Sequence, residues 1–175
     1  MLDRIRAFFR RRPGTKASDV FSSLRQRVLH VRPEDVKVLE GRHLGPVFCA
    51  LMEFGLPKAT ASVVVVADGT VSFYTSTGGG TIGGGEHAVV REAGMRFLDV
   101  AGDQARSLEL TTDFPLPEPG HVRFQVRTSG ADLTGDAPED ALQRGRHLLS
   151  PLYFAGQDVL TEIRLLSDAG GVRPS

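Results

Sequence analysis

The feature that most constrains the fold of this chain is a pair of strand-like segments joined by Asp68 and Gly69. Residues 62–67 contain four consecutive valines, as expected of a strand that is covered on both faces. Asp68 and Gly69 are a strong signal for a two-residue hairpin turn, because both residue types tolerate a positive φ. Residues 70–76 alternate in polarity, which is typical of the returning strand. The chain is therefore predicted to contain an antiparallel β-hairpin at the centre of a sheet.

The segments around this hairpin predict the rest of an α+β fold. Strands are expected at 47–54, 62–67, 70–76, 121–128 and 131–134, which makes an antiparallel sheet of about five strands. Helices are expected at 19–30, from residue 87 onward, over about ten residues opened by Asp136 and Glu139-Asp140, and from Ser150. The predicted architecture is an α/β sandwich with a long helix after the central hairpin and helices at both ends.

The strand at 121–128 alternates most clearly. Val122, Phe124 and Val126 are predicted to point into the core, and the polar residues between them to point outward. On this pattern, the outward face of the strand is expected to be exposed to solvent.

Length and composition agree with one globular domain. The chain has 175 residues, of which 41% are apolar and 24% charged, and these are ordinary values for such a domain. No apolar run approaches the roughly 18 residues that a membrane-spanning helix needs. The single cysteine, Cys49, excludes an intramolecular disulfide framework and a multi-cysteine zinc site. We expect an arm over 1–14, one domain over 15–168 and a flexible tail over 169–175.

The amino-terminal arm is basic, although the whole chain is neutral. Residues 1–45 carry 11 basic and 5 acidic side chains, whereas residues 46–175 carry 10 and 16. Apolar residues recur at helical spacing among arginines in the set Leu2, Arg4, Ile5, Arg6, Phe8, Phe9, Arg10, Arg11 and Arg12.

This arm resembles a small basic amphipathic helix, which can lie on an anionic membrane or dock against a protein partner. The alternatives are a solvated arm or a helix packed on its own domain. The neutral total charge disfavours nucleic acid as a partner. Because the arm lacks the continuous apolar segment of a secretory signal, we expect a cytoplasmic protein.

A glycine-rich loop joins the hairpin to the long helix. Its residues are Gly78, Gly79, Gly80, Gly83, Gly84 and Gly85, followed by Glu86 and His87. Gly78, Gly80 and Gly83 fit the G-x-G-x-x-G spacing of a dinucleotide-binding loop. Against such a site, the preceding strand belongs to an antiparallel hairpin, and Glu86 stands where the phosphate would bind.

Two interpretations of this loop remain open. In the first, the glycines let the connection pass tightly over the sheet. In the second, they form a mobile rim that closes over a ligand or partner. Backbone amides would then hold a nucleotide or phosphate at the start of the helix, and Glu86 or a neutral His87 would perform proton chemistry.

Residues 109–120 contain prolines at three alternate positions, which predict a stiff and extended path. This P-x-P-x-P pattern differs from the P-x-x-P pattern of SH3 ligands. The segment is interpreted either as a rigid strap on the domain's own core or as an edge that presents Phe114 to a partner.

Patterns of catalytic or metal-binding residues are missing from the sequence. The five histidines lack the spacing of metal ligands, no G-x-S-x-G is present, and acidic residues are spread singly. Cys49 lies in an apolar strand, where a thiol is usually inert packing. We therefore expect no cofactor and no metal, and favour a non-enzymatic function.

Two stretches, MEFGLPKATASVVVVADGTVSFYTSTGGGTIGGGEH and RHLLSPLYFAGQDVLTEIRLL, resemble a family of small bacterial proteins with which no activity is associated. The resemblance covers roughly residues 45–167 and implies no functional residues. The order of elements is also similar to the profilin-like roadblock/longin architecture, whose members commonly serve as dimerising platforms for small GTPases or trafficking partners. The strand before the hairpin and the proline-rich segment depart from that pattern.

These features favour a cytoplasmic protein-interaction or adaptor module that is homo-oligomeric or part of a larger assembly. Its contacts would involve the loop from Gly78 to Gly85, Phe114 or the basic arm. The alternative is a small-ligand protein or an enzyme that acts on a phosphorylated or nucleotide substrate through the glycine-rich loop, Glu86 and His87.

Overall fold

The hairpin predicted from the valine run is present in the computed structural model, which describes residues 16–39 and 45–169. β1 (Val47–Leu56), β2 (Ala59–Val66) and β3 (Val71–Thr75) form a meander, and every β2 residue after Ala59 is buried. The turn between β2 and β3 closes with a 2.9 Å hydrogen bond from Val66 N to Thr70 O. Gly69 has a φ of +86°, but Asp68 does not use the left-handed region.

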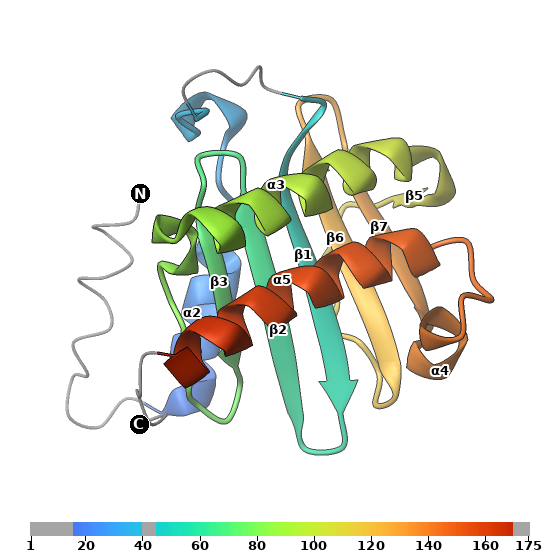
Figure 1. Cartoon of the computed structure of the whole chain (residues 1–175). Helices are drawn as coiled ribbons and strands as arrows, with labels where there is room; N and C mark the ends of the chain where they lie inside the picture. The colour runs from blue at the N-terminus through green and yellow to red at the C-terminus, as the bar shows by residue number, and fades with distance from the viewer. Residues whose placement is uncertain (1–15, 40–44, 170–175) are drawn as a thin grey trace.

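The remaining elements complete an α+β fold (Figure 1). Before the meander come α2 (Ala17–Leu29) and η1 (Pro33–Asp35). After it come β4 (Gly80–Thr81), η2 (Gly84–Glu86), α3 (Ala88–Asp103), η3 (Ala105–Ser107), β5 (Glu109–Leu110), β6 (His121–Thr128), β7 (Asp132–Pro138), α4 (Glu139–Gln143) and α5 (Ser150–Ala169).

The described strands form one open antiparallel sheet in the order β4-β3-β2-β1-β6-β7-β5. It has 7 strands, so the expectation of about five was too low. The additional strands, β4 and β5, have 2 residues each and lie at the two edges of the sheet. Segments this short show no alternating pattern, so the sequence does not indicate them.

The two long helices α3 and α5 lie side by side on one face of the sheet (Figure 1). Glycines bring both helices close to the strands. A Cβ added to Gly94 of α3 would lie 2.7 Å from Val71, and one added to Gly156 of α5 would lie 2.4 Å from Met52. α2 lies on the opposite face, which we call the α2 face.

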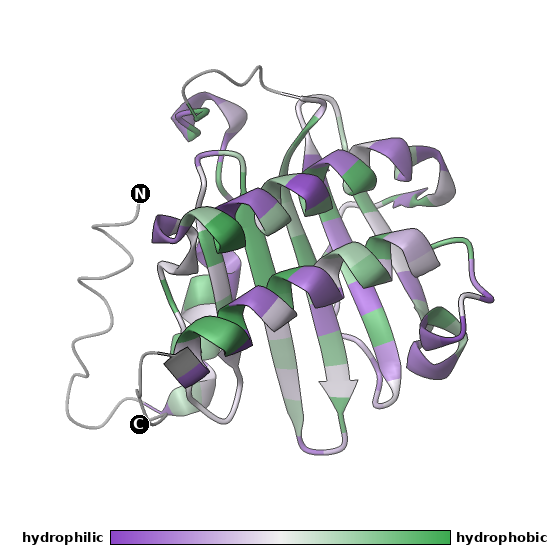
Figure 2. Ribbon diagram, in the orientation of Figure 1, coloured by the Kyte–Doolittle hydropathy of each residue, from purple (hydrophilic) through white to green (hydrophobic). Residues whose placement is uncertain are grey.

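The main apolar core lies between the sheet and the helices α3 and α5. Figure 2 shows β1 and β2 as largely hydrophobic, whereas β6 and β7 alternate between hydrophobic and hydrophilic residues. Met52, Phe97 and Phe124 are fully buried. Burial of one such side chain contributes about 1.5–3 kcal/mol, so this layer supplies much of the driving force for folding.

Two predicted helices differ from the observed ones. α2 begins at Ala17, two residues before the expected start at residue 19, and Lys16 holds the N-cap position. The helix expected from Asp136 and Glu139-Asp140 is present as α4, but it begins at Glu139 and has only 5 residues instead of about ten, because β7 continues to Pro138. Arg123 Nη2 of β6 lies 3.0 Å from Asp136 Oδ2, and this cross-strand contact holds Asp136 in β7.

The polar side of β6 is not exposed as expected. Gln125 is fully buried, and the side chains of Arg123 and Arg127 are 19% and 15% exposed. α2 and residues 111–120, which we call the strap, cover this side of the sheet. The alternation was predicted correctly, but the polar residues lie beneath other segments of the chain.

The predicted arm over 1–14 and residues 170–175 of the predicted tail lie outside the described residues. Within the described ranges, no helix combines the length and the apolar character that crossing a bilayer requires.

Candidate functional site

Polar side chains on five neighbouring strands form a row across the α2 face. Antiparallel pairing places Tyr74 of β3 opposite Ser62 of β2, and Ser62 opposite Glu53 of β1. Glu53 in turn is opposite Arg123 of β6, which is opposite Asp136 of β7. Directly opposed residues share a face and lie about 5 Å apart. We call these five residues the polar row.

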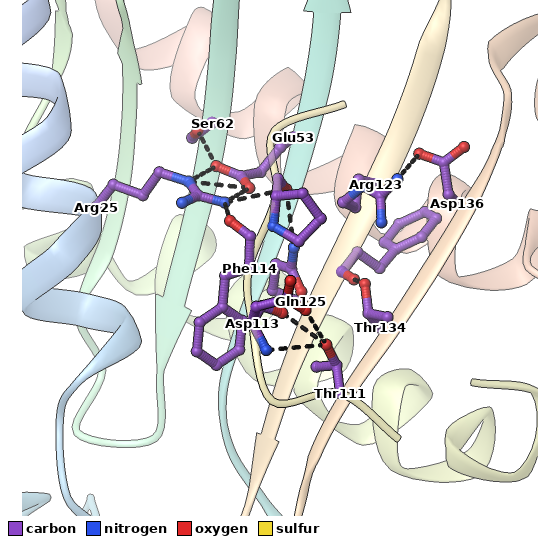
Figure 3. A network of polar contacts seen from close by, with 12 residues as sticks. Arg25, Glu53, Ser62, Thr111, Asp113, Phe114, Arg123, Gln125, Thr134 and Asp136 are labelled. Atoms are coloured by element: carbon purple, nitrogen blue, oxygen red, sulfur yellow. Dashed lines mark hydrogen bonds and ion pairs between the residues drawn. The ribbon is translucent and has the colours of Figure 1, made fainter. Parts of the chain in front are cut away.

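Glu53, at the centre of the polar row, is fully buried and forms an ion pair with Arg25 of α2. Arg25 Nη2 lies 2.7 Å from Glu53 Oε2, and Arg25 Nε lies 2.8 Å from Oε1 (Figure 3). Ser62 Oγ donates a further hydrogen bond to Oε1 at 2.8 Å. Donors from two elements therefore replace the water that the buried carboxylate has lost.

The strap crosses the polar row on its outer side (Figure 3). Arg25 Nη2 donates to the carbonyl of Phe114 at 2.8 Å, and Gln125 Nε2 donates to the carbonyl of Pro115 at 3.3 Å. The guanidinium carbon of Arg127 lies 5.8 Å from the centre of the Phe114 ring. Phe114, a candidate partner contact from the sequence, is thus half-buried against the α2 face.

Several buried polar atoms on this face have no hydrogen-bond partner among the described residues. They include Tyr74 Oη, Gln125 Oε1 and Arg123 Nε. Burial, and to a smaller extent the charge of Glu53, raises the pKa of the Tyr74 phenol. Unpaired buried polar atoms are rare in folded proteins, so their concentration here distinguishes this face from an ordinary core.

The polar row is accessible to solvent at its β7 end. His121 Nδ1 lies 2.6 Å from Asp136 Oδ1, and Arg123 Nη2 lies 3.0 Å from Asp136 Oδ2. The exposed fractions of the His121 and Asp136 side chains are 37% and 26%. Asp136 therefore fixes the orientation of an imidazole and a guanidinium at the edge of the strap.

The polar groups at the centre of this face contact one another and the strap. Donors from Arg25 and Ser62 occupy the Glu53 carboxylate. Arg25 and Gln125 also donate N–H groups to backbone carbonyls of the strap. Within the described part of the chain, no group of three or more His, Cys, Asp and Glu residues could hold a metal ion.

The glycine-rich loop packs its backbone against the strands. A Cβ on Gly80 would lie 2.2 Å from Phe73 O, and a Cβ on Gly85 would lie 1.8 Å from Gly69 O. Positive φ angles occur at Gly78, Gly79, Gly80 and Gly83, and Gly84 is buried beside Val90 and Ile163. These contacts support the structural interpretation of the loop, while ligand binding by it stays a prediction.

Glu86 and His87 are exposed at the junction of η2 and α3. His87 holds the N-cap position of α3 without a side-chain cap. Arg91 Nη1 donates to Gly85 O at 2.7 Å and so connects the loop to the first turns of the helix. Gly80 is opposite Tyr74, so this end of the loop borders the polar row.

A shallow hollow of about 320 Å³ lies between the carboxy end of α3 and the start of β1. Its lining includes Val47, Leu98 and Asp103, and it contains no residue of the polar row or of the glycine-rich loop. The hollow is therefore separate from both candidate regions.

The sequence pointed to Phe114 but not to Arg25, Glu53 or Gln125. One signal was available for Glu53, because it is the only charged residue in the apolar segment 47–54. A charge in a buried strand needs a partner, but the sequence does not show that this partner comes from α2.

Comparisons of the chain with protein-family models, with curated proteins and with solved structures found no match. The resemblances stated from the sequence therefore stay predictions. The arm residues Arg4, Phe8, Phe9, Arg10, Arg11 and Arg12 lie outside the described residues.

Proposed function

We propose that this chain is a non-enzymatic protein-interaction module that associates with a second copy of itself. The observation that carries the proposal is a pair of leucines at one edge of the sheet, Leu110 and Leu148. Their exposed fractions, 78% and 76%, are the largest among the large apolar residues of the described ranges.

The two leucines lie at the β5–β7 end of the sheet. Leu108 and Leu149 contact the same side of Gly135 in β7, where an added Cβ would lie 2.6 Å from each. Leu110 follows Leu108 by two residues and shares its face, and Leu148 directly precedes Leu149. Leu110 and Leu148 are therefore the exposed leucines next in sequence to this contact, and we call them the leucine edge.

An apolar patch beside an unpaired strand favours association. The outer side of β5 pairs with no other described strand. A twofold dimer would use the leucine edge of both copies, which places each pair of leucines against the other. A stable interface buries about 800 Å² on each partner, so the neighbouring surface of β7 and the α4–α5 connection would contribute as well.

We also propose that the fold is that of a profilin-like roadblock/longin platform. This proposal is supported by the order of elements, in which α3 follows the meander and α5 closes the fold on the same face of the sheet. In this role the dimer would act in the cytoplasm as an adaptor or as a subunit of a larger assembly. The basic arm would contact a protein partner or an anionic membrane.

Sedimentation velocity of the full chain tests the proposal. We expect the wild type to sediment as a dimer across the micromolar range and Leu110→Asp and Leu148→Asp to sediment as monomers, because each places a charge in the apolar interface. Leu165→Asp on α5 is the matched control, since this leucine is 57% exposed but lies outside the leucine edge. It should sediment like the wild type.

Circular dichroism of each variant confirms that the fold is retained. A wild type that stays monomeric throughout this range would contradict the proposal, as would two folded edge variants that dimerise like the control.

A further inference from the structure

We propose that the strap is a lid, and that the surface beneath it binds an extended peptide in which an aromatic residue precedes a proline. The surface, which we call the seat, is formed by Arg25, Gln125, Arg127 and Gly55. The seat is separate from the leucine edge, and its binding does not depend on self-association.

The strap is fixed at both ends and held between them by side chains. Thr111 N donates to Asp132 O at 3.0 Å, and Gly120 N donates to Gly55 O at 2.8 Å. Between these anchors, residues 112–119 belong to no described strand or helix. The carbonyls in the middle of the strap accept hydrogen bonds from the side chains of Arg25 and Gln125. The strap can therefore lift without breaking a strand out of the sheet.

The composition of the strap lowers the cost of lifting it. Pro115, Pro117 and Pro119 have no backbone N–H, so their release leaves no donor unpaired. Alternating prolines also keep the released segment extended. The strap therefore loses little conformational freedom when it closes again, and a partner with the same pattern would lose equally little on binding.

The polar row beneath the strap favours opening. Lifting the strap brings water to Arg25 and Glu53, whose burial removes two charges from solvent, and their hydration offsets part of the lost contact energy. The opposite face of the sheet, packed against α3 and α5, would instead expose apolar side chains such as Met52 and Phe124. Local opening is therefore expected on the α2 face and not on the other.

The strap itself shows which chemistry the seat recognises. Arg25 and Gln125 bind the carbonyls of two successive residues, Phe114 and Pro115. The ring of Phe114 lies against the Arg127 guanidinium, a cation–π contact. Further along, a Cβ on Gly55 would lie 1.9 Å from Glu118 O, so the glycine allows the bound backbone to approach the sheet.

Charge adds little to this selectivity. Residues 111–120 contain two acidic residues, Asp113 and Glu118, and no basic one, but Glu53 and Asp132 already pair with the two arginines of the seat. The strap competes with a partner at an effective concentration of about a millimolar, so weakening the strap should raise the affinity of the seat for a free peptide.

Fluorescence anisotropy of a labelled peptide with the sequence of residues 111–120 tests this proposal on the full chain. We expect the peptide to bind Phe114→Ala at least about tenfold more tightly than the wild type, because the strap of this variant lacks its ring. A peptide with alanine in place of that phenylalanine is the matched control, and the Phe114→Ala variant should bind it no more tightly than the wild type does. Gln125→Leu in the Phe114→Ala background should weaken binding about tenfold, since it removes one donor to the peptide.

The measurements are made at a concentration where sedimentation shows monomers, so a failure of self-association does not affect them. A folded Phe114→Ala that binds the peptide no more tightly than the wild type overturns the proposal. If this variant does not fold, Pro117→Gly repeats the test with the ring in place. Failure of both variants to fold would show that the strap is part of the core. A dimer with exchanged straps that the peptide does not displace would assign the seat to a second copy, and the proposed partner class would be wrong.

Discussion

Arg25 and Glu53 are 28 residues apart in the chain and form a bidentate ion pair with an Nη2–Oε2 distance of 2.7 Å. The exposed fractions of their side chains are 7% and 0%, so a charge pair connects α2 to the centre of the sheet. The loss of hydration of two such charges can equal or exceed their mutual attraction. We infer that the pair sets the position of α2 more than it adds to net stability.

Replacing one member of this pair should be more harmful than replacing both. Arg25→Met or Glu53→Leu alone is expected to lower the free energy of unfolding by about 3–5 kcal/mol, because the remaining charge is buried without a partner. The double variant should recover most of this loss. Urea denaturation of the wild type, both single variants and the double variant measures the coupling. Strictly additive losses would show that the two charges do not depend on each other.

Loss of the hydroxyl group should change the free energy of unfolding in opposite directions at the two tyrosines. Tyr74 Oη has no partner among the described residues, so Tyr74→Phe should raise the free energy of unfolding by about 1 kcal/mol. Tyr153 Oη accepts a hydrogen bond from Gln157 at 2.6 Å, so Tyr153→Phe should lower it by a similar amount, about 1 kcal/mol. Thermal unfolding of both variants measures the difference. A destabilised Tyr74→Phe would reveal a partner for this hydroxyl.

A methyl group in the glycine-rich loop should be costly where the backbone is tightly packed. Gly85→Ala would place Cβ 1.8 Å from Gly69 O, and we expect a loss of about 1–3 kcal/mol as the loop shifts away from β3. Gly130→Ala is the matched control, because nothing lies within 4 Å of its added Cβ, and should change stability by less than about 0.5 kcal/mol. Chemical denaturation compares them. Equal stability of the two variants would contradict the structural interpretation of the loop.

Cys49 should make the protein less stable as the solution becomes alkaline. Burial raises the pKa of its thiol from 9.0 to about 12. Below pH 9.0 the thiol is neutral in both states, whereas between pH 9.0 and about 12 it ionises only in the unfolded chain. The free energy of unfolding should therefore fall as the pH rises through this window.

Denaturation on either side of pH 9.0 measures this fall, and Cys49→Ala should reduce it. The raised pKa of Tyr74 lowers the free energy of unfolding further at higher pH, and Cys49→Ala does not remove this contribution. An unchanged slope near pH 9.0 in Cys49→Ala would indicate that the thiol is ionised or exposed in the folded protein.

The elements predicted best from the sequence are those whose pattern repeats over many residues. The β2–β3 hairpin was predicted with its turn at Gly69, and the helix predicted after the glycine-rich loop is present and buries Val90, Phe97 and Ala101 along one face. These patterns arise from backbone geometry within one element, which gives a helix its period of 3.6 residues and a strand its period of 2. They need no information about distant segments.

Elements were missed where a contact from elsewhere in the chain decides the structure. β4 and β5 form because neighbouring strands offer free hydrogen-bonding edges. β7 extends through Asp136 because Arg123 lies opposite. In both cases the local residues alone fit a loop or a helix start equally well.

The sequence by itself determined the hairpin, the long helices and the alternation of β6 into an apolar and a polar face. Only the tertiary structure decided that the polar face is covered and that Arg25, Glu53 and the strap meet there. The physical reason is that periodicity follows from the geometry of adjacent residues. The burial of a charge, in contrast, depends on a partner supplied by a remote segment, and that partner is known only once the chain has folded around it.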